Sequence, residues 1–312
     1  MKAPRFSIVT ATLNRAALLR EAIASVEGQG REDVEHLIID GGSTDGTLEM
    51  LAAHPRLRVV SEPDRGLYDA FNKGLALASG DIVHFLNSDD LLVPGALAAV
   101  DAAFADERVD VVTGAVDFFE RAPDGNERVL RRVESGLVLE LSLRRMLRGV
   151  SVFNARFFRR SFALRVGPFD LAYRIAADRD FLVRAALARP RSIVVPQMVY
   201  RYRSHAGSLT VHESDRNAAL IRREHVALAE KHLAHPLAYA DRAELAALHR
   251  RESAALAVEA LAAGRWSEMG AWARRGCAAS ALWPCAAAVR LGGWLLGRSS
   301  HGPLAPAETS AP

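Results

Sequence analysis

The chain is poor in cysteine and has no long unbroken hydrophobic run. Its 312 residues include only two cysteines, Cys277 and Cys285. No histidine cluster lies near them, so we expect two reduced thiols in a cytosolic setting rather than a disulfide or a metal knuckle. The most apolar stretch, 277–297, is interrupted by Pro284 and Arg290 and therefore predicts no clear membrane span.

Neither sign of charge is in large excess. The chain has 40 Lys and Arg against 37 Asp and Glu, a net charge of +3, which is too small to indicate a nucleic-acid partner. Half of the residues are hydrophobic and a quarter are charged, a composition typical of a globular protein with a sizeable core. A strand-like run begins directly after Arg5, so we expect no signal peptide and a cytoplasmic location.

Strand-like and helical stretches alternate in the first part of the chain. Helical patterns separate five expected strands, which cover residues 6–11, 35–39, 57–60, 81–86 and 109–113. This alternation predicts an α/β fold with a mostly parallel sheet flanked by helices on both faces. Such sheets bind ligands beyond the carboxyl ends of their strands. Three unusual loops follow strands there, at residues 10–15, 40–46 and 87–90.

The rest of the chain is less regular and then becomes helical. A helix is expected over 178–187 and strands over 193–195 and 199–202, whereas residues after 215 are Ala-rich and almost wholly helical. We therefore expect three parts: an α/β domain, a C-terminal helical region and a disordered tail rich in Ser, Gly and Pro. Their expected bounds are 1–212, 213–297 and 298–312.

The fourth expected strand ends in two adjacent carboxylates, Asp89 and Asp90. Two such anions repel each other unless a cation lies between them and a ligand. Mg²⁺ or Mn²⁺ binds through one or two carboxylates and completes its coordination with phosphate and water. The pair therefore predicts a metal–diphosphate site. The alternative is an Asp-Asp turn that leads into the helix opened by Pro94.

The turn at residues 40–47, DGGSTDGT, follows the second expected strand. Its glycine pair permits positive φ and close approach of a ligand. Asp40, at the strand tip, is in a position to accept a hydrogen bond from a base or ribose, while the following Ser or Thr can cap the next helix. A dinucleotide site would need G-x-G-x-x-G after the first strand. Residues 10–15 read TATLNR instead, which disfavours an NAD site.

Together these motifs resemble the family 2 glycosyltransferases with a GT-A fold. The resemblance spans roughly residues 5–210 and rests on 7–15 (SIVTATLNR), 40–47 and 87–90 (NSDD). Residues 61–74, SEPDRGLYDAFNKG, resemble a bacterial branch that builds capsule, O-antigen and exopolysaccharide, with the colanic-acid enzymes among them. The resemblance implies an inverting transfer of a sugar from a nucleotide-diphosphate sugar to a hydroxyl of a lipid-linked glycan acceptor. It also implies a divalent metal, Mn²⁺ or Mg²⁺, on the diphosphate.

The resemblance implies roles for particular residues. Asp89 and Asp90 match the carboxylates of the family's D-x-D-type motif, and His205 is a further metal candidate. Asn87 stands where many relatives carry Asp, so the principal ligand of the pair is left open. His205 as a hydrogen-bonded surface residue and Lys73 as a solvated helix residue are the alternatives. The implied donor-binding residues are Thr10, Thr12, Asp40, Asp64, Tyr68, Asn72, Lys73 and Arg203.

Inverting transfer needs a base that takes the proton of the attacking hydroxyl. The family places this carboxylate in a Glu-Asp motif at the start of a later helix. Residues 176–182 read AADRDFL, with Ala177 in place of the usual Glu and Asp178 at the base position. Asp180 is the second choice. The alternative is that Asp178 caps the helix and Asp180 interacts with its dipole.

All four tryptophans lie within residues 264–297, interleaved with arginines. This pattern predicts a helix pair on an anionic membrane surface, where a polyprenyl-linked acceptor would be found. A helical cap on the catalytic domain or a dimer contact fits the pattern equally well.

Two rival functions stay open. A nucleotidyltransferase would carry a Gly-rich basic loop after the first strand, which this chain lacks. A non-catalytic nucleotide-sugar-binding subunit is favoured by the departures at Asn87 and Ala177. The donor sugar, its base, the acceptor and the oligomeric state are not identified by the sequence.

Overall fold

The chain divides into two units. The computed structural model describes residues 4–122, 124–134, 139–149, 152–205 and 214–295. One unit comprises Met1–Ser142 and Val152–Ala206, and the other comprises Leu143–Ser151 and Gly207–Pro312. Helix α6 (Leu143–Arg148) therefore groups with the C-terminal helices, whereas the sequence pattern suggested a single break after residue 212. The tail expected at 298–312 lies outside the described residues.

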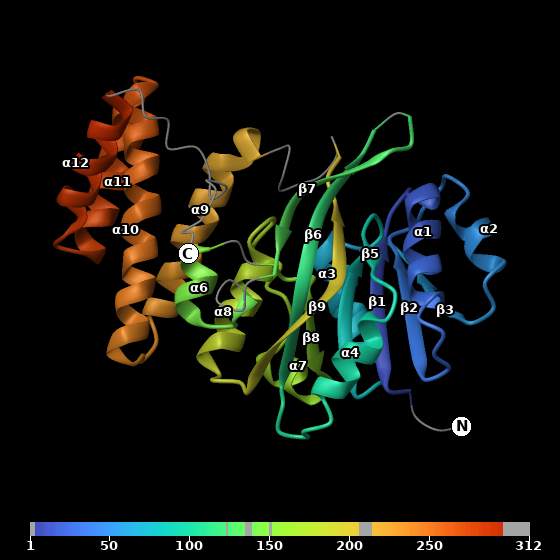
Figure 1. Cartoon of the computed structure of the whole chain (residues 1–312). Helices are drawn as coiled ribbons and strands as arrows, with labels where there is room; N and C mark the ends of the chain where they lie inside the picture. The colour runs from blue at the N-terminus through green and yellow to red at the C-terminus, as the bar shows by residue number, and fades with distance from the viewer. Residues whose placement is uncertain (1–3, 123, 135–138, 150–151, 206–213, 296–312) are drawn as a thin grey trace, which may run out of the picture. The chain divides into compact units, whose positions relative to one another are not determined.

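A nine-stranded sheet forms the centre of the first unit (Figure 1). The strand order is β3-β2-β1-β4-β8-β6-β9-β5, with β7 paired to β6. The strands are β1 (Phe6–Thr12), β2 (Val34–Asp40), β3 (Leu57–Ser61), β4 (Ile82–Asn87), β5 (Leu91–Leu92), β6 (Val111–Arg121), β7 (Glu127–Val133), β8 (Arg156–Arg159) and β9 (Ser192–Arg203).

Parallel pairing is confined mainly to one half of this sheet. Strands β3, β2, β1 and β4 pair in parallel as the sequence predicts. Strand β8 lies antiparallel between β4 and β6, and β6 then pairs in parallel with β9. The sheet is thus mixed rather than parallel throughout, because residues after 150 return to the middle of the sheet.

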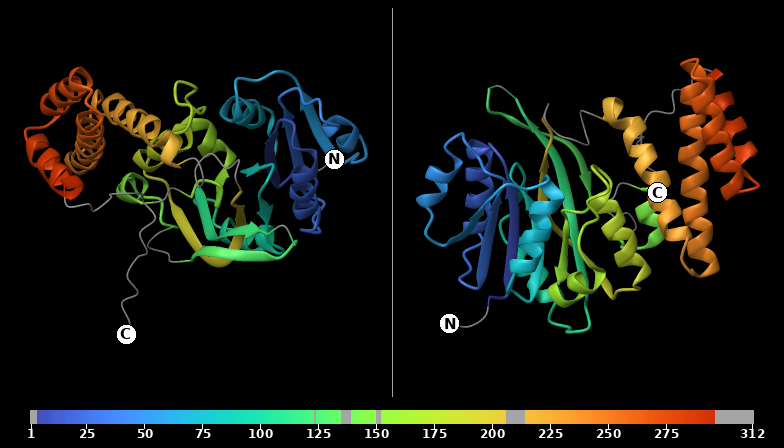
Figure 2. Two further views of the ribbon diagram at one scale, coloured as in Figure 1. Left: turned by 90° about the horizontal axis from the view of Figure 1, so that it is seen from above. Right: turned by 180° about the vertical axis from the view of Figure 1, so that it is seen from behind.

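Helices cover both faces of the parallel half. These helices are α1 (Ala16–Glu27), α2 (Thr47–Ala52) and α3 (Leu67–Leu77), and α4 (Ala96–Ala103), α7 (Arg160–Val166) and α8 (Ala177–Leu187) complete the unit. Helix α1 buries residues at spacings of three and four, which include Leu19 and Ile23 in contact with Ile38 of β2. It lies in front of the sheet in Figure 1, whereas α3 lies in front in the reverse view of Figure 2.

The second unit is helical. Besides α6 it contains α9 (Ser214–Leu233), α10 (Tyr239–Ala262), α11 (Trp266–Ala279) and α12 (Trp283–Leu295). Trp283 fixes α12 to α10, because its ring packs against Ala254 and Ala257 and its indole N–H donates to the Ser253 hydroxyl at 2.9 Å. Within the described residues, no helix combines the length and the apolar character needed to cross a membrane.

Gly74 allows α3 to pack directly on β1. A Cβ atom added at Gly74 would lie 2.1 Å from Cγ1 of Val9. We expect Gly74→Ala to lower the free energy of unfolding by about 1–3 kcal/mol, because an overpacked core must shift its backbone or rotamers. Urea unfolding measures the change.

Gly292→Ala is the matched control for this prediction. Gly292 also lies inside a helix, but nothing stands within 4 Å of its added Cβ. Alanine should therefore raise stability there by about 0.5–1 kcal/mol through helix propensity. If the free energy of unfolding rises in both variants or falls in both, the packing argument is refuted.

Two buried histidines in the first unit give folding a pH dependence. Burial lowers the pKa of His36 to about 3 and that of His84 to about 4. The unfolded chain, with histidine pKa values of about 6.5, binds more protons as the pH falls below that value. Stability is therefore complete above pH 6.5 and is lost as the pH falls toward 4, by about 2 kcal/mol per histidine at pH 5.

His84→Phe tests this linkage. The His84 ring stacks on Phe157 at a centroid distance of 4.1 Å, so phenylalanine suits the space. Urea unfolding gives the free energy of unfolding at pH 7 and at pH 5. The decrease between these two pH values should be smaller in the variant than in the wild-type protein by about 2 kcal/mol. His54→Phe, at a partly exposed histidine, serves as the control and should keep the wild-type difference. An unaltered pH difference in His84→Phe would contradict the prediction.

Candidate active site

Three loops meet at the carboxyl edge of the parallel strands. In the sheet register Thr12 lies opposite Asp40, and Ala11 lies opposite Asn87. The loops after β1 and β2 are also joined directly: the backbone N–H of Asn14 donates to the Ser43 hydroxyl at 2.7 Å. Asn14 has a φ of 52°, a left-handed conformation that asparagine tolerates better than most residues.

Asp40 is fully buried and organises its own turn. Its carboxylate accepts hydrogen bonds from the backbone N–H groups of Gly42 and Ser43, from the Ser61 hydroxyl at 2.6 Å and from the Ser43 hydroxyl. Burial alone would raise the pKa of Asp40, but the hydrogen bonds from Ser43 and Ser61 outweigh it and lower the pKa. Because protein donors occupy both oxygens, the predicted bond to a base or ribose requires one of these donors to leave.

The two threonines of β1 have different environments. Thr10 is fully buried, and its hydroxyl is 3.0 Å from Nε2 of His36. Its side chain therefore faces the interior, which corrects the expectation that it contacts the donor. Thr12 lies at the strand end, and its buried hydroxyl has no hydrogen-bond partner among the described residues. A buried hydroxyl without a partner costs about 1–3 kcal/mol, so a ligand group at this position would be favoured.

Asp89 lies between two basic side chains. Its Oδ2 accepts a hydrogen bond from Arg15 at 2.6 Å and lies 2.9 Å from Nε2 of His205. Burial alone would raise the pKa of Asp89, but the hydrogen bond with His205 and the charge of Arg15 outweigh it and lower the pKa. The side chain is therefore an anion at the rim of the site.

Asp90 is turned into the protein. Its oxygens accept hydrogen bonds from the Tyr200 hydroxyl at 2.6 Å, the Asn87 amide at 2.9 Å and the backbone N–H of Arg203 at 2.6 Å. Burial and the neighbouring Asp89 charge raise the pKa of Asp90 to about 8, against the effect of these donors. Because Asp90 joins the turn to β9 while Asp89 faces basic groups, the geometry favours Asp89 as the ligand.

The pair of Asp89 and His205 fits a divalent cation in one respect. A carboxylate oxygen of Asp89 and an imidazole nitrogen of His205 lie 2.9 Å apart, close enough for both to bind one cation. Within the part of the chain that the structure describes, no group of three or more His, Cys, Asp or Glu side chains is arranged to hold a metal ion. Two protein ligands suit a cation that takes its other ligands from a diphosphate and water. The nitrogen ligand favours Mn²⁺ over Mg²⁺, which prefers oxygen.

Arg203 holds the turn that carries the two carboxylates. Its guanidinium pairs with Glu21 at 2.6 Å, donates to the backbone oxygen of Asp89 at 2.9 Å and stacks over Phe119. The side chain is nearly buried. These contacts join Arg203 to the Asp89 turn, and its role at the donor stays a prediction.

Two expected donor residues on α3 instead connect this helix to the chain before α8. The Tyr68 hydroxyl donates to the backbone oxygen of Ile175 at 2.8 Å. The Asn72 amide donates to the backbone oxygen of Phe169 at 2.9 Å and accepts from its N–H at 2.7 Å. Both side chains therefore link two segments of the site, which differs from the donor contact that the resemblance implies.

Lys73 and Asp64 contact different parts of the protein. The Lys73 ammonium pairs with Glu62 at 2.9 Å and donates to the backbone oxygen of Pro63 at 2.9 Å. The ammonium is therefore engaged within the protein, and its phosphate role stays a prediction. Asp64 lies against the glycine turn, since a Cβ added at Gly41 would stand 2.7 Å from its Oδ2. Of these two, Asp64 borders the predicted donor pocket.

The two acids at the start of α8 are in unlike settings. Asp180 is fully buried and pairs with Arg184 at 2.8 Å. Asp178 is partly exposed and accepts a hydrogen bond from the backbone N–H of Arg179 at 2.6 Å. The N-cap residue is Ala176 rather than Asp178, and it makes no capping hydrogen bond with its side chain. This geometry favours Asp178 over Asp180 as a base.

The sequence reasoning missed Arg15 and Tyr200. Arg15 ends the motif TATLNR, and the parallel register of β1 and β4 places the ends of these two strands side by side. That register, which the predicted fold implies, would have brought Arg15 to the Asp89 turn. Tyr200 lies on β9, whose pairing was not predictable, and no comparable signal in the sequence pointed to it.

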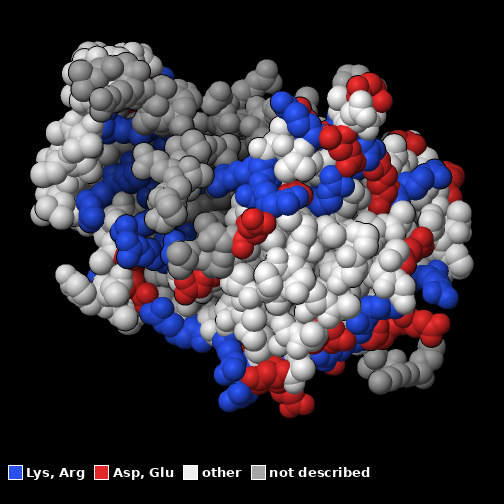
Figure 3. All heavy atoms as spheres, viewed as in Figure 1, with Lys and Arg blue, Asp and Glu red and all other residues white. Residues whose placement is uncertain are grey.

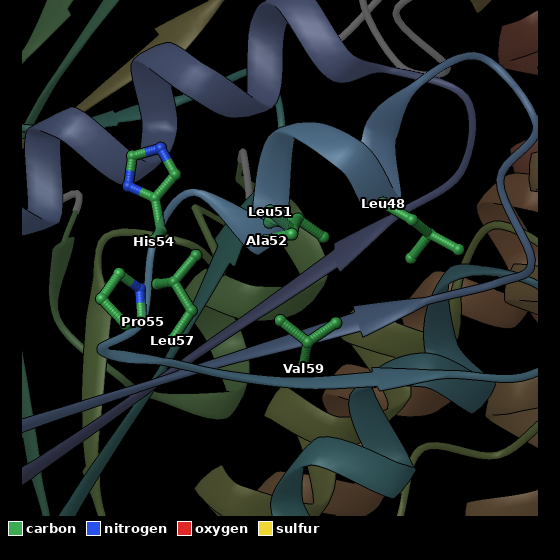
Figure 4. Close-up of a pocket in the computed structure, with 7 residues that line it drawn as sticks. All are labelled: Leu48, Leu51, Ala52, His54, Pro55, Leu57 and Val59. Atoms are coloured by element: carbon green, nitrogen blue, oxygen red, sulfur yellow. The ribbon is translucent and has the colours of Figure 1, made fainter.

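An apolar surface pocket lies elsewhere in the first unit (Figure 4). It has a volume of about 300 Å³ and contains none of the predicted site residues. Its lining residues come from α2, β3 and the turn between them: Leu48, Leu51, Ala52, His54, Pro55, Leu57 and Val59.

Comparison with known sequences identifies relatives. Residues 7–167 match the model of glycosyl transferase family 2. An uncharacterised glycosyltransferase of Mycobacterium tuberculosis is 35% identical over 190 residues, covering 59% of this chain and 70% of the relative. A PGL/p-HBAD biosynthesis glycosyltransferase of Mycobacterium bovis is 35% identical over 192 residues, with the same coverage.

Solved structures share the fold. Residues 1–349 of S. aureus TarS in complex with UDP-GlcNAc superpose with a TM-score of 0.68 and 19% identity, covering 95% of this chain and 93% of that one. The mannosyltransferase PcManGT of Pyrobaculum calidifontis, in complex with GDP-Man and Mn²⁺, gives a TM-score of 0.58 at 22% identity, with coverages of 96% and 82%. Because the family model matches more than half of its length, the chain belongs to glycosyl transferase family 2 and is a glycosyltransferase with a GT-A fold.

Proposed function

We propose that this glycosyltransferase is inverting and Mn²⁺-dependent, and that it moves a sugar from a nucleotide-diphosphate sugar to a hydroxyl of a lipid-linked glycan in bacterial surface polysaccharide synthesis. The observation that carries the proposal is the Asp89 anion beside His205, at the edge where the loops after β1, β2 and β4 meet. Structural neighbours in complex with UDP-GlcNAc, or with GDP-Man and Mn²⁺, support a nucleotide-sugar donor and a metal.

The nucleotide would bind over the joined loops after β1 and β2. The Thr12 hydroxyl offers an unsatisfied polar group there, and Asp64 borders the glycine turn. Gly42 has a φ of 93° and leaves open space where a side chain would stand. The backbone therefore admits close approach of a base or ribose.

Asp89 and His205 would hold the metal, and Arg15 would lie beside it. When bound, the cation neutralises the charge that develops on the departing nucleoside diphosphate. Asp90, Tyr200 and Arg203 keep the Asp89 turn in place through the hydrogen bonds described above.

Asp178 would take the proton of the attacking hydroxyl. Its carboxylate is partly exposed, so an acceptor can approach it, whereas the buried Asp180 is paired with Arg184. A positioned carboxylate base typically contributes 10²–10⁴-fold to rate.

The proposal also covers the acceptor and the location of the protein in the cell. Relatives named for PGL/p-HBAD biosynthesis support a biosynthetic role. Trp266 and Trp294 on α11 and α12 are exposed, which supports peripheral contact of residues 264–297 with the cytoplasmic face of the inner membrane. Trp283, in contrast, is buried within the second unit.

A panel of nucleotide sugars tests the proposed reaction. A bound donor raises the melting temperature in the presence of Mn²⁺ by mass action. Turnover releases a nucleoside diphosphate as the sugar passes to an added soluble hydroxyl acceptor or to water. EDTA should abolish that release. A nucleotidyltransferase would leave the nucleotide sugars intact and would instead release pyrophosphate from a nucleoside triphosphate supplied with a sugar phosphate. A non-catalytic subunit would bind the donor without any release. Either of these results would overturn the proposal.

A further inference from the structure

A groove between α10 and α12 combines basic and apolar side chains. Its volume is about 490 Å³, and both helices belong to the second unit. Three arginines enter it, with an apolar floor around them. The lining residues are Ala247, Arg250, Arg251, Cys285, Ala286, Val289, Arg290 and Gly293.

Positive charge in this groove is only partly compensated. Arg251 pairs with Glu252 at 2.9 Å, and Arg222 pairs with the same carboxylate at 3.1 Å. Arg250 makes one hydrogen bond, to the Ser280 hydroxyl at 3.3 Å. Arg290 has no hydrogen-bond or ion-pair partner among the described residues. Burial and the nearby charge of Arg222 lower the pKa of Arg290, and the charges of Glu259 and Glu252 offset this only in part. An anion beside Arg290 would therefore be favoured.

The α12 side of the groove is apolar rather than acidic. Val289 is 78% exposed and Leu295 is 68% exposed, and both lie on α12. Between Glu268 and the end of α12 the sequence contains no acidic residue. Basic side chains gather over the C-terminal helical unit in Figure 3. A soluble anion would use the arginines alone, whereas the exposed aliphatic side chains need a partner that is also apolar.

We propose that the α10–α12 groove binds the phosphate headgroup of an anionic membrane phospholipid, with Arg250 and Arg290 on the phosphate and the α12 aliphatic face against the acyl region. Guanidinium groups suit this ligand because they donate bidentate hydrogen bonds to phosphate. An amphipathic helix lying in the bilayer interface buries its apolar side chains in the same way. The inference deepens the proposed membrane contact of residues 264–297 and rests on it.

Flotation of the full chain with vesicles tests the groove. The probes are vesicles of phosphatidylcholine alone and vesicles of phosphatidylcholine mixed with anionic phosphatidylglycerol. We expect Arg290→Gln to weaken binding to the anionic vesicles by more than tenfold. Arg274→Gln is the matched control, because Arg274 is exposed on α11 outside the groove. Loss of this one surface charge should weaken the binding of Arg274→Gln to the anionic vesicles by about fivefold at most.

Val289→Glu tests the apolar side of the same proposal. Val289 is exposed, so the variant should fold normally, and we expect it to lose binding to both kinds of vesicle. If Arg290→Gln and Arg274→Gln lose equal affinity for the anionic vesicles, the attraction is a diffuse effect of surface charge and the specific phosphate site is overturned. Binding of inorganic phosphate, measured by calorimetry, without any flotation of the protein would indicate a soluble anion and would overturn the lipid site. A dimer that Val289→Glu dissociates would assign the face to a second copy.

Failure of this inference is distinguishable from failure of the proposed reaction. Nucleotide release is measured without vesicles, and Arg290→Gln should leave it unchanged. If release is absent from the wild-type protein, the proposed reaction fails; if release is normal but Arg290→Gln floats like the wild type, only the lipid site fails.

Discussion

Asp178→Asn is expected to lower the turnover number by about 10²–10⁴-fold, the range that a positioned general base contributes. Asparagine keeps the shape of the side chain but cannot take the proton of the acceptor hydroxyl. Because Asp178 is partly exposed and is not the capping residue of α8, the variant should keep the wild-type melting temperature and nucleotide affinity. Turnover is followed by nucleoside diphosphate release, and affinity by calorimetry.

Asp180→Asn is the matched control, two residues along the same helix. Asp180 is buried against Arg184, and breaking a buried pair typically costs about 3–5 kcal/mol. This variant should therefore lose stability, which Asp178→Asn should not. Wild-type turnover in Asp178→Asn would end the assignment of Asp178 as base.

Asp89→Asn is expected to remove the dependence of nucleotide binding on Mn²⁺. The Asp89 carboxylate is the anion that lies next to His205 and Arg15 at the rim of the site. An amide oxygen is a weaker ligand and carries no charge for the cation. Calorimetry of UDP and GDP with and without Mn²⁺ should show at least a tenfold metal effect in the wild-type protein and none in the variant. Turnover should fall together with metal binding.

Asp90→Asn tests which of the two neighbouring carboxylates binds the metal. Three donors point at Asp90, and an asparagine NH₂ would face at least one of them. We expect a loss of about 1–3 kcal/mol in stability, the cost of an unsatisfied buried polar group, with the Mn²⁺ effect on nucleotide binding retained. If Asp90→Asn instead abolishes the Mn²⁺ effect while Asp89→Asn keeps it, the two assignments must be exchanged.

The parallel half of the sheet and its loops could be predicted from the sequence because their signals are local. Each strand there is a short apolar run, and each loop follows the strand that positions it. The Asp89–Asp90 turn, the glycine turn after Asp40 and the start of α8 all lie near where the sequence pattern suggested. Parallel register then brings the first two loops to one edge.

The other half of the sheet depends on contacts between distant residues. Strand β9 continues through Pro196 because the pairing with β6 shifts register beside Gly114, and a bulge is a position where proline is tolerated. The expected strands 193–195 and 199–202 are therefore one strand. Nothing local indicated that β8 would enter between β4 and β6.

Side-chain roles were the hardest to predict. Alternation along β1 places Thr10 and Thr12 on the same face, yet only Thr12 reaches the strand end, while Thr10 meets His36. Tyr68 and Arg203 match the family's motifs but bond to Ile175 and to the Asp89 turn. A motif identifies the residue types that a site needs, whereas the partner that each residue chooses depends on segments far away in the sequence.

The double hydrogen bond between Asn72 and Phe169 has a mechanical consequence. Helix α3 begins just after Asp64, beside the glycine turn, and Asn72 anchors the segment that leads into α8 and Asp178. These two bonds hold α3 and the segment before α8 together. If the nucleotide and the acceptor bind as proposed, this link would align them before either one arrives, without closure at each cycle.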